Sequence, residues 1–188
     1  LEGDLLTDGI LQLLRLSNDK VPSIYDLWAE KYHTTLDTIQ SRSAEVDEEM
    51  KCTYGELMSR IRKETKTVIK AVQDGGFTKE AVSKALSLPE AAGEKEWKDK
   101  LEALLHFVTD EIYPRLERTG EEMDHTLDAL DGRYVEPGPS GSPNAGGVSL
   151  LPSGRNFYGV DPRTLPSPTG WQLGVKLGDK MIEKFIAD

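Results

Sequence analysis

The side chains best suited to binding chemistry gather in one irregular stretch between Gly132 and Thr169, which holds most of the chain's ten prolines. Its arginines are Arg133, Arg155 and Arg163, and its aromatic residues include Tyr134, Phe157 and Tyr158. Guanidinium groups pair with carboxylates and aromatic rings offer flat surfaces, so a planar ligand with acid groups would use both. The same side chains could instead only fasten the loop to neighbouring helices, and spacing alone leaves the two interpretations equal.

Metal-ligating and nucleophilic side chains are sparse elsewhere. Glu122 and His125 share a helix face, as do Glu121 and His125 and also Glu102 and His106. Ferritin-like dimetal sites need Glu-x-x-His twice and two further glutamates, so one such element predicts a solvated face and no metal site. The lone Cys52 has no histidine beside it in sequence and is expected to be a small helix residue.

The sequence has no phosphate-binding loop motif of the kind that opens a helix in nucleotide-binding proteins. The run from Gly138 to Pro143 could point amides at an anion, but its prolines remove donors, which favours a tight turn. If the protein uses ATP, we therefore expect another subunit to hydrolyse it.

Composition narrows the class of protein. The chain has 188 residues and a net charge of -10, which argues against non-specific nucleic-acid binding and against docking on an anionic membrane surface. A single cysteine fits a reducing compartment, and no apolar run reaches membrane-spanning length, so we expect a cytoplasmic protein. Residue 1 is not Met and the last residues still follow a helical period, which indicates a piece of a longer protein.

The elements that must position the irregular stretch are helices. Hydrophobic spacing predicts helices over 4–16, 23–32, 44–73, 79–86, 97–116 and 123–130, and a last helix beginning at Pro168. Pro114 should kink or split its helix near Ile112. The expected fold is mainly α, a multi-helix domain with a long ordered Pro/Gly-rich loop before the last helix.

Three parts are expected: a helical region over 1–130, the loop over 131–169 and a C-terminal helix over 170–188. The last helix carries glycines at every fourth position, Gly170, Gly174 and Gly178. Such a line either lets another backbone approach closely or is incidental in a weak helix, and both interpretations remain open.

Three runs of the irregular stretch together resemble the large subunit of the ATP-dependent cobaltochelatases, a family that includes the magnesium chelatase large subunit. They are LDGRYV from Leu130, PGPSGSP from Pro137 and LPSGRNFYGVDPR from Leu151. Magnesium chelatases tend to carry a Lys-Asn-Ile-His type run where this chain has Arg155-Asn156-Phe157-Tyr158, so the chain looks closer to the cobalt type. Before Ala129 the resemblance rests on helical character and order.

The resemblance implies a function in cobalamin biosynthesis. Co²⁺, as substrate metal, would enter a hydrogenobyrinate-type macrocycle with loss of the two inner pyrrole protons. The partners would be the tetrapyrrole, the rest of the large subunit and AAA-type ATPase subunits, which would bind the ATP; no nucleic acid or membrane is implied. The isolated chain would be inactive.

The resemblance also gives candidate site residues. Those expected in the tetrapyrrole cleft are Arg133, Tyr134, Arg155, Asn156, Tyr158 and Asp161. Those expected to shape the loop are Gly132, Pro137, Gly138, Gly154 and Pro162. No catalytic residue carries over. Two alternatives remain, a helical protein-interaction module without its own ligand and a magnesium chelatase-type subunit acting on a porphyrin.

Overall fold

The computed structural model describes residues 3–15, 20–47, 50–139, 141, 147–157 and 167–187. The structure is 71% helical with few strands, which confirms the mainly α fold. The division into three parts stays a prediction. Within the described residues no helix is long and apolar enough to cross a membrane.

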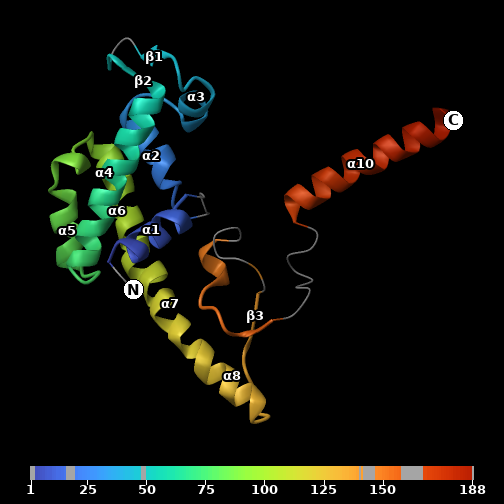
Figure 1. The fold of residues 1–188 in the computed structure, drawn as a ribbon. Helices are drawn as coiled ribbons and strands as arrows, with labels where there is room; N and C mark the ends of the chain where they lie inside the picture. Colours follow the sequence, from blue (N-terminus) through green and yellow to red (C-terminus); the bar gives the residue numbers. More distant parts are fainter. Residues whose placement is uncertain are drawn as a thin grey trace.

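The N-terminal part is a bundle built around one long helix. Its helices are α1 (Gly3–Leu13), α2 (Ile24–Lys31), α3 (Leu36–Ser41), α4 (Tyr54–Asp74), α5 (Lys79–Leu86) and α6 (Lys95–Phe107), with a 3-10 turn η1 (Pro89–Ala91) before α6. Helix α4 packs against α1, α2, α3 and α5, and α6 packs against α2 and α5 (Figure 1). Fully buried side chains from four helices fill the centre, among them Ile10, Trp28, Leu57, Ile61, Leu101 and Leu105.

Local capping fixes several helix ends. The Ser23 hydroxyl accepts from the backbone of Tyr25, and the Thr78 hydroxyl caps α5 in the same way. Thr53 and Glu56 form a reciprocal capping box at the start of α4. These caps place the starts of α2 and α5 where the sequence predicts them.

The segment before α4 is not helical, so the predicted start of that helix at Ala44 is wrong. Strands β1 (Val46–Asp47) and β2 (Cys52–Thr53) form a short antiparallel hairpin, so Cys52 lies in a strand and not in a helix. The Asp47 carboxylate accepts from the backbone of Met50, and Lys51 has a positive φ of 52°. This side-chain bond competes with the helical one and turns the chain back on itself. Helix α3 was not predicted.

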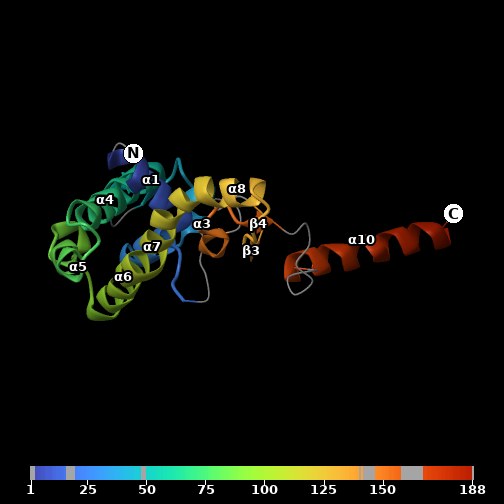
Figure 2. The same cartoon turned by 90° about the horizontal axis from the view of Figure 1, so that it is seen from below.

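A long helical rod leads from the bundle to the loop. After α6 it continues through a π-helical turn η2 (Val108–Ile112), α7 (Tyr113–Glu117), a 3-10 turn η3 (Arg118–Glu121) and α8 (Glu122–Leu130). The α-helix is interrupted near Ile112, where the sequence predicts a kink or split. The backbone N–H of Tyr113, just before Pro114, donates to the carbonyl of Val108, five residues earlier. A π turn accommodates the proline, which lacks an N–H donor. Figures 1 and 2 both show α8 projecting beyond the bundle.

The loop after α8 folds back along it. Gly132 ends α8 at a φ of 75°, and the bonds from Gly132 to Ala129 and from Arg133 to Asp128 complete a Schellman cap. Strand β3 (Pro137–Gly138) pairs in parallel with β4 (Asn156–Phe157), and a 3-10 turn η4 (Val148–Leu150) lies between them. The side chain of Leu151 is buried in the main core cluster, so this end of the loop is anchored to the bundle.

The last helix, α10 (Pro168–Ala187), begins where the sequence predicts. It stands apart from the other helices in Figure 1, and large apolar side chains along it, such as Trp171 and Phe185, are exposed. A side chain added at Gly174 or Gly178 would meet nothing within 4 Å, so the described residues place no backbone against this line of glycines.

Candidate functional site: a groove between helix α8 and the loop

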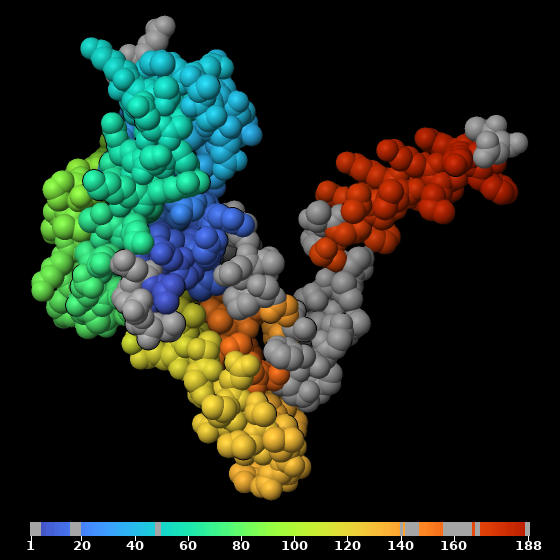
Figure 3. Space-filling model, viewed as in Figure 1, coloured from blue at the N-terminus to red at the C-terminus, as the bar shows by residue number. Residues whose placement is uncertain are grey.

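A groove of about 530 Å³ lies between α8 and the returning loop. Helix α8 and the loop lie side by side in the space-filling view, where they are yellow and orange (Figure 3). The wall of the groove includes Glu122, His125, Gly132, Arg133, Gly154 and Arg155. Pockets that bind small molecules typically enclose about 300–1,000 Å³, so the groove is large enough for part of a ligand.

Gly154 brings the loop into direct contact with α8. Its φ is 78°, in the left-handed region, and a Cβ there would lie 2.4 Å from the Cβ of Glu122. Its carbonyl oxygen lies 3.0 Å from Nδ1 of His125, and the neighbouring Ser153 hydroxyl donates to the Glu122 carboxylate. Only glycine satisfies both the backbone conformation and the close approach. The position therefore supports the prediction that Gly154 shapes the loop.

Arg155 lies across β3 on the groove wall. Its Nε donates to the carbonyl of Pro152 and its Nη2 to that of Leu151, both at 3.2 Å. A Cβ on Gly138 would lie 2.7 Å from Nε, so the missing side chain at this position makes room for the guanidinium. Within the described residues no carboxylate pairs with Arg155. Its positive charge is thus held on the groove wall by neutral partners.

Arg133 lies at the other end of the groove and has acidic partners. Its guanidinium pairs with Asp128 at 2.8 Å and with Asp131 at 2.7 Å, and two-thirds of the side chain is exposed. These contacts hold the arginine beside the helix cap that Gly132 makes. The adjacent Tyr134 is 82% exposed and is not part of the groove wall.

The remaining predicted residues are described in part or not at all. Pro137 pairs with Asn156 in the parallel strands, and only the backbone of Asn156 is described. Tyr158, Asp161 and Pro162, with Arg163, lie outside the described residues. Whether any candidate contacts a ligand stays a prediction.

Several groove residues were not predicted to belong to a cleft, among them Glu122 and His125. Their spacing on one helix face predicts a solvated face and no metal site. Their partner, Gly154, comes 29 residues after His125 in the chain, so no periodicity could have joined them. Among the described residues no group of three or more His, Cys, Asp or Glu side chains is arranged to hold a metal ion.

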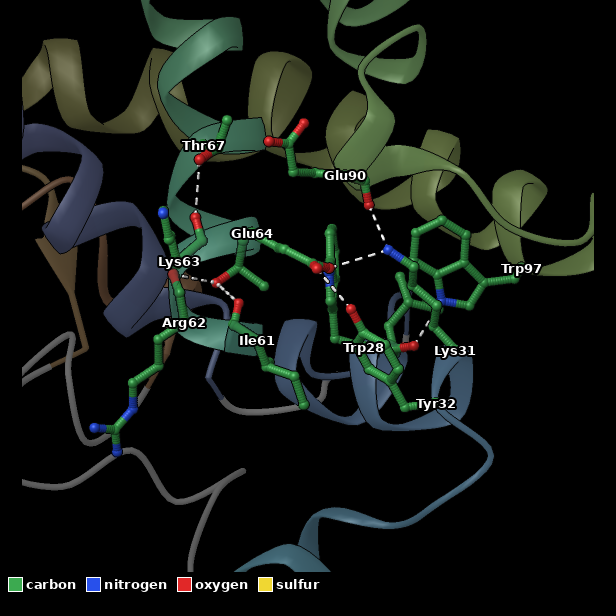
Figure 4. Close-up of polar contacts among 12 residues, drawn as sticks. Trp28, Lys31, Tyr32, Ile61, Arg62, Lys63, Glu64, Thr67, Glu90 and Trp97 are labelled. Atoms are coloured by element: carbon green, nitrogen blue, oxygen red, sulfur yellow. Dashed lines mark hydrogen bonds and ion pairs between the residues drawn. The ribbon is translucent and has the colours of Figure 1, made fainter. Parts of the chain in front are cut away.

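A second cluster of ionisable groups lies between α2 and α4 (Figure 4). The Glu64 carboxylate accepts from Trp28 Nε1 at 3.0 Å, from Lys31 Nζ at 3.0 Å and from the Tyr32 hydroxyl at 2.6 Å. Lys31 also donates to the carbonyl of Glu90 at 2.7 Å. Burial, and then the bond to Glu64, raise the pKa of Tyr32 above its ordinary value. Because each polar group here has a partner, the arrangement is typical of a structural brace and offers no free group for chemistry.

Comparisons with known proteins cover the whole chain. The family model CobN/Magnesium Chelatase matches residues 1–188. The aerobic cobaltochelatase subunit CobN of Pseudomonas aeruginosa is 40% identical over 86 residues, which are 45% of this chain and 7% of that protein. A magnesium-chelatase subunit of Chlorobaculum parvum is 37% identical over 73 residues, 39% of this chain and 6% of that protein.

A solved structure has the same fold. The catalytic subunit of cobaltochelatase from Mycobacterium tuberculosis matches with a TM-score of 0.61 and 28% identity, over 96% of this chain and 14% of that one. The chain thus spans only a small part of the length of the relatives it matches.

Proposed function

The chain belongs to the CobN/magnesium chelatase family, and we propose that it is part of the large, tetrapyrrole-binding subunit of an ATP-dependent cobaltochelatase. This subunit acts in cobalamin biosynthesis, where Co²⁺ is inserted into a hydrogenobyrinate-type macrocycle. Separate AAA-type subunits bind and hydrolyse the ATP. The similarity to two CobN proteins and to a solved cobaltochelatase structure supports the choice of metal.

The observation that carries the proposal is the Arg155 guanidinium on the groove wall. Its two described hydrogen bonds use neutral carbonyl acceptors. A guanidinium has five N–H donors, so further donors are available for a carboxylate of the macrocycle rim. Arg133, by contrast, is paired with Asp128 and Asp131, so Arg155 is the groove arginine whose charge is not offset by a described carboxylate.

The size of the groove limits its part in binding. We infer that it takes one side of the macrocycle, from an acid side chain at the rim to the inner pyrrole nitrogens, and that the rest of the large subunit encloses the remainder. Gly154 holds the loop against α8 and so places the groove residues before a ligand binds. Ligands bind more tightly when the contacting groups are already in place.

The test is a titration of the complete large subunit with a hydrogenobyrinate-type tetrapyrrole, followed by absorbance and calorimetry. Arg155→Gln removes the charge and keeps a donor for the loop carbonyls, and we expect it to weaken binding by about tenfold or more, as loss of a charge-assisted bond does. Arg42→Gln is the matched control, because Arg42 pairs with Glu45 and neither residue lines the groove. Equal affinity in the Arg155 variant and the wild type would assign Arg155 a bracing role only.

A magnesium chelatase-type activity on a porphyrin is the second candidate, and the similarity to the magnesium-chelatase protein of Chlorobaculum parvum supports it. The two are separated by supplying the assembled complex with Co²⁺ or Mg²⁺ and with either macrocycle. Insertion of Mg²⁺ into a porphyrin, with no product from Co²⁺ and the hydrogenobyrinate-type macrocycle, would replace the first proposal by the second.

A further inference from the structure

The imidazole of His125 is held in one defined orientation. Its Nδ1 lies 3.0 Å from the carbonyl oxygen of Gly154. A carbonyl oxygen only accepts hydrogen bonds, so Nδ1 of the neutral ring carries the hydrogen and donates. The other ring nitrogen, Nε2, then carries the lone pair.

The loop residue that orients the ring packs closely on α8. Gly154 packs on the backbone of Glu122, one turn before His125 on the same helix. The ring is half-buried and forms part of the groove wall, and within the described residues no hydrogen bond or ion pair engages Nε2. A basic nitrogen is thus fixed on the same wall as Arg155.

We propose that Nε2 of His125 accepts a proton from the macrocycle during metal insertion, a role that rests on the proposed function above. A pyrrole N–H bond breaks, its electron pair stays on the pyrrole nitrogen and binds Co²⁺, and the proton forms a bond to Nε2. The imidazolium passes that proton to water, which restores Nε2 for the second pyrrole proton. Two protons leave for each Co²⁺ that enters, and Gly154 acts as the positioning residue.

The test compares two substitutions in the assembled complex. Asparagine at this position carries an amide that can replace Nδ1 as donor to Gly154 but has no counterpart of Nε2. We expect His125→Asn to keep the macrocycle affinity within about twofold and to lower kcat at least about 100-fold, as loss of an acid–base group does. His106→Asn is the control, because His106 lies on α6 beside Glu102 and outside the groove.

His125→Ala adds a readout that a bracing role would not produce. Added imidazole should restore its insertion rate, and a series of substituted imidazoles should restore it in the order of their basicity. This dependence on basicity reports proton transfer itself, whereas a packing defect would respond to the size of the additive.

Three results would overturn the proposal: a His125→Asn enzyme with undiminished kcat, loss of macrocycle binding in that variant, or loss of its Co²⁺ affinity. The first would leave His125 as a brace, the second would make it an affinity contact and the third a metal ligand. If the wild-type large subunit itself does not bind the tetrapyrrole, the proposed function fails as well, so the two failures are distinguishable.

Discussion

Gly154 shows how a single missing side chain can determine the position of a loop. The residue combines a left-handed backbone, contact with Glu122 and a carbonyl that orients His125. Gly154 and Gly132 were named from sequence because the runs that carry the family resemblance include them, and their part in shaping the loop stays a prediction. His125 could not be identified in the same way, since its role depends on a contact between distant parts of the chain.

We predict that Gly154→Ala releases the loop from α8. The left-handed conformation costs about 1–2 kcal/mol for a residue with a Cβ, and the contact with Glu122 adds to this cost. Limited proteolysis between Gly147 and Arg155 should become faster, and the NMR signals of the His125 ring should shift. Gly174→Ala is the control, since nothing lies within 4 Å of its added Cβ. Unchanged cleavage and unchanged His125 signals would show that the contact is dispensable.

At the scale of elements, helices with clear ends were predicted well. The segment from Lys79 to Leu86 has Thr78 as its cap and Pro89 beyond it, so both ends are encoded locally. The α6 stripe was also found, because its apolar spacing matches one buried face. The hairpin before α4 was missed because its apolar and charged residues follow a helical period, whereas the Asp47 side-chain bond and the backbone bonds across the hairpin divert the chain.

The junction of α2 with α4 gives a prediction at this scale. Lys31 and Glu64 are largely buried, with 14% and 16% of their side chains exposed, and Glu64 also holds Trp28 and Tyr32. Glu64→Ala would leave the lysine charge buried without its partner, which costs about 3–5 kcal/mol. Urea unfolding followed by circular dichroism measures the loss. Glu102→Ala, at an exposed site, should change stability by about 0.5 kcal/mol or less. Equal stability of the two variants would contradict the bracing role.

At the scale of the whole molecule, the described residues include a strongly apolar exposed surface, the outer face of α10. Its side chains are far more exposed than those of the bundle, for example 64% for Trp171, 59% for Ile182 and 84% for Phe185. Exposed apolar patches of this kind mark interaction sites in proteins. The exposed face also leaves open the alternative of a protein-interaction module. Binding of a defined partner protein in the absence of tetrapyrrole would support that alternative.

We predict that the chain over residues 1–188 self-associates when it is produced alone, because the large apolar side chains along α10 are exposed and another copy of the chain can cover them. Sedimentation velocity over a range of concentrations should show this. Replacing Trp171 and Phe185 by glutamate should give a monomer, whereas replacing the exposed Lys176 and Lys180 by glutamine should not. A wild-type chain that stays monomeric at all concentrations would contradict the prediction.

The three tryptophans make the bundle and α10 optically distinguishable. Trp28 and Trp97 lie in the core with ring centroids 5.2 Å apart in an edge-to-face arrangement, and Trp97 donates to the carbonyl of Leu27. Trp171 is exposed to water on α10. Emission from the buried pair should therefore lie to the blue of that from Trp171. Emission collected at the red edge would come mainly from the solvated indole, so burial of Trp171 when α10 meets another molecule can be followed by fluorescence without an added label, while the core pair serves as an internal reference.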